Sequence, residues 1–135
     1  MKVPTGNTKE DIKERKNIII RFYQEWKSKN PSQKRYNLNL QDYINIRNIS
    51  MVETSAHASK NYLSTLAVLQ LDAILTNAKK IRIAKAKNNG NQKGFEKIII
   101  MECLLPGLGN VKLTVGVKKS NSEKVQYCIT FIETK

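Results

Sequence analysis

The feature of this sequence that most constrains its fold is a change of hydrophobic period at Lys79. Before this point, apolar residues recur at steps of three and four, as they do along one side of an α-helix. After it, apolar and polar residues alternate or apolar residues run continuously, as they do in β-strands. Helices followed by consecutive strands are typical of an α+β domain, in which the helices cover one face of an antiparallel sheet.

The first expected helix covers residues 9–29. Thr8, with Asp11 three residues later, resembles a capping box, and the helix should end before Pro31. Its apolar stripe is expected to pack into the core or to form a partner-facing seam, which leaves a homodimer through this helix open. The stripe consists of Ile12, Ile19, Phe22, Tyr23 and Trp26.

A second helix is expected over residues 60–77, with Ser59 or a nearby hydroxyl as its cap and Asn77 as its stop signal. The segment before it, residues 30–58, mixes turn signals with short alternations. Within that segment, "YINIRNI" fits either a strand or an extended connector. The apolar side of the second helix consists of Leu63, Leu66, Ala67, Leu71, Ile74 and Leu75.

Four apolar or alternating segments joined by short turns follow, which predicts a roughly four-stranded antiparallel meander from Lys79 to Glu133. The length is that of a single domain, with residues 1–50 as an N-terminal helix and connector and residues 51–135 as the second helix and the sheet. Alternation puts Val125, Tyr127, Ile129 and Phe131 on the apolar side of the final strand. The polar side of the strands is expected to carry Lys80, Arg82, Lys112, Thr114, Lys118, Gln126 and Thr130.

The charge of the chain favours a polyanionic partner. Lys and Arg number 24 against 11 Asp and Glu, a net charge of +13, and residues 79–135 contribute +8 of it. Lysine and arginine gain by releasing the counterions condensed on phosphates, so RNA is the predicted partner and the sheet half its binding region. The alternative is a solvated basic surface that only keeps the protein soluble.

Several kinds of chemistry find no support in the sequence. One histidine and two distant cysteines without a Cys-x-x-Cys pair argue against a zinc site, and the carboxylates are too scattered for two-metal phosphodiester cleavage. No phosphate-binding glycine loop and no nucleophile elbow are found, and no metal or cofactor is predicted. Because no apolar segment follows Met1 and Lys2, we expect no signal peptide, a cytoplasmic location and free thiols.

RNA can be cleaved without a metal because its own 2′-hydroxyl is the nucleophile, so that the protein supplies a base, an acid and cations. His57 is the candidate base: ahead of the second helix, it should lie near the positive end of the helix dipole. Lys60, three residues on, would share its helix face, and the amide groups there would form an anion site. The alternative is that His57 caps the helix and Lys60 is solvated.

The order "VETSAHASK", helix, "KKIRIAK", loop and three further strands resembles the barnase–EndoU–colicin–RelE superfamily of ribonuclease toxins. More narrowly, it is similar to the branch found in phage and mobile-element polyvalent proteins, over about residues 50–133. The resemblance implies an α+β fold with a four-stranded antiparallel sheet and RNA cleavage without metal. The matching positions are His57, Ser59 and Lys60, then Val111, Leu113 and Val115, then Tyr127 and Ile129.

These observations lead to one hypothesis and two alternatives. The hypothesis is a metal-independent endoribonuclease that is accompanied by an acidic antitoxin or immunity protein. The first alternative is a non-catalytic nucleic-acid-binding accessory of a phage or mobile element; the second is a protein-interaction module. The predicted catalytic residues are His57, Lys60, Thr114 and Thr130. The predicted RNA-binding residues are Ser59, Lys80, Arg82, Lys112 and Lys118.

Overall fold

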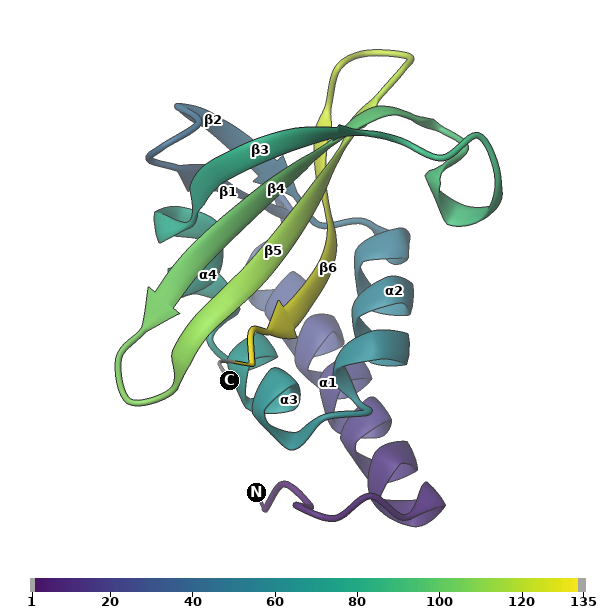
Figure 1. Cartoon of the computed structure of the whole chain (residues 1–135), viewed down its shortest axis with the longest axis vertical. Coiled ribbons are helices and arrows are strands. Elements are labelled where there is room, and N and C mark those ends of the chain that lie inside the picture. Colours follow the sequence, from purple (N-terminus) through teal and green to yellow (C-terminus); the bar gives the residue numbers. More distant parts are fainter. Residues whose placement is uncertain (1, 134–135) are drawn as a thin grey trace.

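The computed structural model describes residues 2–133, and these form an α+β fold of four α-helices and six strands (Figure 1). The helices lie together on one side of a curled sheet whose strands β3, β4 and β5 cross the front of the view. No helix in this part of the chain is both long and apolar enough to cross a bilayer. The elements are α1 (Lys9–Lys29), β1 (Lys34–Asn37), β2 (Asp42–Asn45), α2 (Asn48–Ala58), α3 (Tyr62–Val68), α4 (Leu71–Asn77), β3 (Lys79–Lys85), β4 (Phe95–Leu105), β5 (Gly109–Lys118) and β6 (Lys124–Phe131).

The sheet is larger than the four-stranded antiparallel sheet that the sequence predicts. Its order is β1-β2-β6-β5-β4-β3, in which β3 to β6 form the expected antiparallel meander. The hairpin of β1 and β2 extends it, and β2 runs parallel to β6 with Asn45 opposite Val125. The sheet is therefore mixed. β1 and β2 have only four residues each and lie in an Asn-rich segment, so their alternation is too short to be identified from the sequence.

Helix α1 begins and ends as predicted. The Thr8 hydroxyl accepts a hydrogen bond from the Asp11 backbone N–H at 3.1 Å, and the helix ends at Lys29. Such a cap satisfies one of the free amides at a helix start. Most of the apolar stripe is directed into this chain's own core: Ile19 and Tyr23 are fully buried and Trp26 nearly so.

The expected helix over residues 60–77 is wrong in its start and its continuity. It is divided into α3 and α4, and α2 precedes it in the segment that the sequence left open. The cap of α3 is Asn61, whose side chain accepts from the Ser64 backbone N–H at 2.9 Å, whereas Ser59 is the buried C-cap of α2. Asparagine is at least as good a cap as serine, and α4 does end at Asn77.

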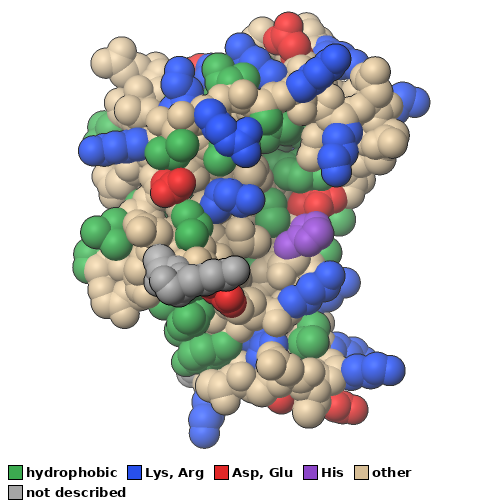
Figure 2. All heavy atoms as spheres, in the orientation of Figure 1, with side chains coloured by type: hydrophobic (Ala, Val, Ile, Leu, Met, Phe, Trp, Pro, Cys, Tyr) green, Lys and Arg blue, Asp and Glu red, His purple; other side chains and the backbone are tan. Residues whose placement is uncertain are grey.

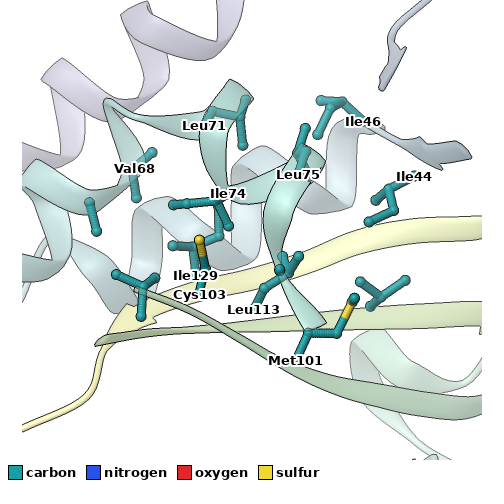
Figure 3. Close-up of a cluster of buried hydrophobic side chains, with 14 of the residues drawn as sticks. Ile44, Ile46, Val68, Leu71, Ile74, Leu75, Met101, Cys103, Leu113 and Ile129 are labelled. Atoms are coloured by element: carbon teal, nitrogen blue, oxygen red, sulfur yellow. The ribbon is translucent and has the colours of Figure 1, made fainter. Parts of the chain in front are cut away.

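The hydrophobic core lies between the helices and the sheet face that carries Met101 and Leu113, which we call the helix face (Figure 3). Met101 and Leu113 are fully buried there, together with Leu71 and Ile74 of α4. Burying a side chain of this size contributes roughly 1.5–3 kcal/mol. The opposite face of the sheet, which carries Ile100 and Lys112, is called the outer face.

A β-bulge in β6 changes which residues face the core. Thr114 is opposite Cys128 but Val115 is opposite Gln126, so that Tyr127 is the extra residue. Gln126 is consequently buried on the helix face, where it accepts from the Tyr23 hydroxyl at 2.6 Å. The prediction that Gln126 lies on the polar side is wrong. So is the prediction that Val125 and Tyr127 share a face with Ile129, because both belong to a small cluster with Phe95 on the outer face.

A second bulge, in β3, separates two predicted RNA-binding residues. Lys80 is opposite Met101, on the helix face, whereas Arg82 is opposite Ile100, on the outer face. The register shift falls at Ile81, which is 55% exposed. The prediction that Lys80 and Arg82 share one face is therefore wrong, because an extra residue in a strand reverses the alternation beyond it.

Candidate active site

A cleft of about 330 Å³ lies on the outer face of the sheet. Helix α2 forms one wall, β5 and β6 form the floor, and the loop of residues 86–94 contributes the remaining side. Figure 2 shows this face, with the imidazole of the chain's single histidine in purple and Lys and Arg side chains around it. We call this the outer cleft; its lining residues are Glu53, His57, Lys87, Gln92, Ile98, Lys112, Thr114, Tyr127, Cys128 and Thr130.

Four of the predicted site residues meet in the outer cleft, although they come from three separate elements. His57 extends from α2, Lys112 and Thr114 from β5, and Thr130 from β6. Lys112 is directly opposite Thr130 in the sheet. The fold therefore brings together three of the residues predicted to be catalytic and one of those predicted to bind RNA.

The other five predicted residues do not line the outer cleft. Ser59 is buried, and its backbone carbonyl accepts from Arg15 Nε at 2.7 Å. Lys60 lies in the turn after α2, so the expectation that it shares a helix face with His57 is wrong. The three remaining residues lie on the strands: Lys80 on the helix face, Arg82 on the outer face away from the cleft, and Lys118 beside Glu123 at 4.0 Å.

His57 does not lie where the sequence predicts it. It occupies the last turn of α2, whereas the expectation was the first turn of a helix. The C-terminal end of a helix carries partial negative charge and directs carbonyl groups outward, so the predicted anion site of amide groups is absent at this position. The cause is α2 itself, because residues 48–58 lack the apolar stripe from which a helix is predicted.

A buried carboxylate takes the place of that helix end as the partner of His57. His57 Nε2 lies 3.2 Å from Glu53 Oε2, one helical turn earlier, and the other carboxylate oxygen of Glu53 accepts from the Asn91 side chain. The Glu53 side chain is 10% exposed, whereas that of His57 is 53% exposed. The imidazole is therefore held by a recessed carboxylate, and its other ring nitrogen, Nδ1, makes no hydrogen bond within residues 2–133.

Glu53 is the principal residue that the sequence analysis missed. The sequence does contain an indication of the Glu53–His57 pair, because residues 53 and 57 have the i, i+4 spacing at which side chains meet on a helix. That spacing has meaning only if the segment is helical, and residues 48–58 lack a strong apolar stripe. The remaining lining residues that were missed come from the loop and from the bulged strand.

Tyr127 adds a second ionisable group to the outer cleft. Burial raises the pKa of its hydroxyl, and the neighbouring Glu53 charge raises it further, while a hydrogen bond with Gln92 acts in the opposite direction. The phenol therefore stays protonated at neutral pH and can donate a proton or a hydrogen bond. The bulge in β6 is what directs Tyr127 to this face.

Cys128 lies in the outer cleft but is poorly suited to act as a nucleophile. Burial, with a smaller contribution from Glu53, raises the pKa of its thiol to about 11. Cys103 is the other cysteine and both are free. A thiol acts as a nucleophile through its thiolate, so Cys128 contributes packing rather than reactivity.

Thr114 has a structural role in the outer cleft. Its hydroxyl accepts from the Cys128 backbone N–H at 3.1 Å and donates to the Cys128 carbonyl at 3.3 Å. These bonds occupy the hydroxyl and fix the bulge in β6. Thr114 thus positions Tyr127 and Cys128, and direct chemistry by its hydroxyl would require breaking a bond to the strand.

The cations of the outer cleft are Lys112 on its floor and Lys87 at its loop side. They outnumber Glu53, the carboxylate in the lining, so the site attracts anions. Within residues 2–133, no group of three or more His, Cys, Asp and Glu side chains is placed to hold a metal ion.

Comparisons with protein-family models, with curated proteins and with solved structures found no match to this chain.

Proposed function

We propose that this protein is a metal-independent endoribonuclease whose active site is the outer cleft. The observation that carries the proposal is the Glu53–His57 pair, an imidazole held by a buried carboxylate, in one cleft with Lys112 and Tyr127. An oriented base, a protonated acid and a cation are the groups that cleavage by the RNA 2′-hydroxyl needs. The sequence resemblance to ribonuclease toxins supports the same reaction class.

In the proposed reaction, His57 is the general base. Its Nδ1 removes the proton from the 2′-hydroxyl, whose oxygen attacks the adjacent phosphorus. Glu53 accepts a hydrogen bond from Nε2, which fixes the tautomer and stabilises the imidazolium that forms, as a carboxylate does for histidine in hydrolytic triads.

Tyr127 is the proposed general acid and Lys112 the proposed electrostatic group. The phenol gives its proton to the departing 5′-oxygen, so that a 2′,3′-cyclic phosphate and a 5′-hydroxyl are formed. Lys112 stabilises the negative charge that accumulates on the phosphorane oxygens. Thr130, opposite Lys112, is placed to hydrogen-bond the same phosphate.

The test is cleavage of total RNA and tRNA in the presence and absence of EDTA, with wild-type protein and with His57→Gln and Glu53→Gln. We expect cleavage that resists EDTA, and a loss of roughly a hundredfold or more in rate for His57→Gln. Glu53→Gln keeps the shape of the side chain but removes the charge that stabilises the imidazolium, so its rate should fall by a smaller factor. Thermal unfolding and RNA affinity of both variants should stay close to wild type.

Three results would contradict the proposal. Cleavage that requires a divalent metal would replace the mechanism, and a His57→Gln variant that cleaves at the wild-type rate would remove the proposed base. Salt-sensitive RNA retention without any cleavage would instead support the alternative of a nucleic-acid-binding accessory, which the excess of lysine on the sheet half also favours.

A further inference from the structure

A second hollow, of about 190 Å³, lies beside the outer cleft, and we propose that it binds a nucleobase of a single-stranded RNA, a few nucleotides from the phosphate in the cleft. The inference rests on the proposed function. We call it the Phe95 hollow. Its lining includes Arg47, Ile49, Asn91, Gly94, Phe95 and Lys118.

Both hollows lie along α2. Ile49 near the start of the helix borders the Phe95 hollow, and His57 near its end borders the outer cleft. Eight residues of helix correspond to about 12 Å. A stacked strand advances about 3.4 Å per nucleotide, so one strand of a few nucleotides can reach from one hollow to the other.

The partition between the hollows is narrow. Asn91 donates from the loop to Glu53, and the rings of Phe95 and Tyr127, which line one hollow each, meet edge to face with centroids 5.8 Å apart. Asn91 lines the Phe95 hollow, whereas its neighbour Gln92 lines the outer cleft. A strand that follows α2 therefore passes this loop residue on its way between the two.

The chemistry of the Phe95 hollow suits a base with a phosphate at its rim. Its lining is mainly apolar, with the half-buried side chain of Ile49 and the largely buried side chains of Phe95 and Val125. Arg47 and Lys118 supply cations, and Glu123 holds both, at 2.7 Å and 4.0 Å. An apolar recess with cations at its rim suits an unpaired base and the phosphate attached to it.

Two glycines, Gly116 and Gly94, leave room for the Phe95 ring and for the hollow beside it. Gly116 lies under the ring of Phe95, where a Cβ atom would come within 2.5 Å of it, so the ring can lie flat against the strand. Gly94 lines the hollow with nothing within 4 Å of the position of a Cβ atom. A larger residue at 94 is therefore tolerated without a clash at its Cβ atom, at the edge of the hollow.

The experiment uses that position. Gly94→Leu fills the hollow, Gly94→Ala fills it in part, and Asn88→Leu is the control, since it adds the same side chain to an exposed position of the loop. The probes are labelled oligodeoxyadenylates of six and of two nucleotides, which cannot be cleaved by 2′-hydroxyl attack. Circular dichroism and thermal unfolding report whether each variant is folded.

We expect wild-type protein to bind the hexamer more tightly than the dimer. Gly94→Leu should weaken hexamer binding about tenfold and Gly94→Ala by less, with dimer binding unchanged in both and Asn88→Leu like wild type. Equal hexamer affinity in Gly94→Leu and wild type, equal losses for hexamer and dimer, or no binding of either probe would overturn the inference. If the hexamer depends on Gly94 but an RNA hexamer stays intact, the inference holds and the proposed ribonuclease activity fails.

Discussion

The two faces of the sheet differ in what they are made of and in what covers them. On the helix face, Met101 and Leu113 are fully buried against the helices. On the outer face, the neighbouring positions are Glu102, Lys112 and Thr130, which lie side by side across three strands. One strand thus supplies a sealed core from every second residue and an open polar cleft from the residues between.

Because alternate residues of β5 face opposite sides of the sheet, substitutions along this strand can separate effects on stability from effects on the proposed activity. A change on the helix face should alter the free energy of unfolding, whereas a change on the outer face should alter interactions with RNA. The bulge in β6 is the exception, since it carries a polar residue into the core and an aromatic residue out of it. The predictions below test this division, from the largest expected effect to the smallest.

Leu113→Ala should have the largest effect on stability. The side chain is fully buried in the core, and its truncation leaves a cavity, so we expect the free energy of unfolding to fall by about 2–5 kcal/mol. The adjacent change Lys112→Ala, on the outer face, should alter it by about 0.5 kcal/mol or less. Urea denaturation of both variants measures the comparison, and similar losses in the two would break it.

Gln126→Leu tests the polar residue that the bulge carries into the core. Gln126 accepts from the Tyr23 hydroxyl and donates to Thr54 at 2.9 Å, and leucine leaves both groups without this partner. We expect a loss of about 1–3 kcal/mol in the free energy of unfolding. Gln24→Leu, the same change at an exposed position of α1, should cost about 0.5 kcal/mol or less. A Gln126→Leu protein as stable as wild type would show that the buried network contributes nothing.

Lys112→Ala tests the difference between the two sheet faces through RNA binding. Removing one phosphate contact should reduce the slope of log affinity against log salt concentration by about 0.7 for single-stranded RNA. Lys80→Ala removes a lysine of the same sheet from the opposite face and should leave the slope unchanged. Filter binding at a series of salt concentrations measures the slopes, and equal slopes for all three proteins would mean that the outer face is only solvated.

The smallest expected effect concerns Glu123, at the rim of the outer face. Its hydrogen bond with Arg47 lowers the pKa of the carboxyl group, with Lys118 contributing further. A carboxyl whose pKa is lower in the folded protein stabilises the fold at neutral pH, and this stabilisation is lost as the pH falls through the folded value. Glu123→Gln should cost about 1 kcal/mol or less at pH 7, and this cost should disappear as the pH falls through the lowered pKa of the folded protein, measured by thermal unfolding. A cost that stays the same as the pH falls would contradict the ion pair as its source.

The strands after Lys79 were predictable because their periodicity is local. β3 to β6 lie where the alternation placed them, and the end of α1 is fixed by Pro31. The faces were less predictable, because a bulge depends on what the neighbouring strand requires. Thr114 satisfies the backbone of Cys128 across the sheet, and nothing in the β6 sequence indicates that contact.

The candidate site was half predictable for a related reason. Alternation predicts Lys112 and Thr114 in β5, and Thr130 in the part of β6 that follows the bulge. His57 attracts notice as the single histidine. Glu53 required α2, a helix whose buried side is mostly small and polar: Ser50, Glu53, Thr54, Ser55 and Ala58. Such a helix is held by tertiary contacts with β6 rather than by an apolar stripe, so periodicity does not reveal it.

Strand β6 follows every other described element in the chain, yet it lies inside the sheet, between β2 and β5. Its contact with β2 joins positions as distant as Asn45 and Val125, and it supplies Tyr127 and Thr130 to the outer cleft. During synthesis, the β1–β2 hairpin and the β3–β5 strands therefore stay separate until β6 has been translated, because β6 lies between β2 and β5. Under the proposed function, the consequence is one of timing: the nascent chain has no assembled outer cleft with which to attack the message or the ribosome that is producing it.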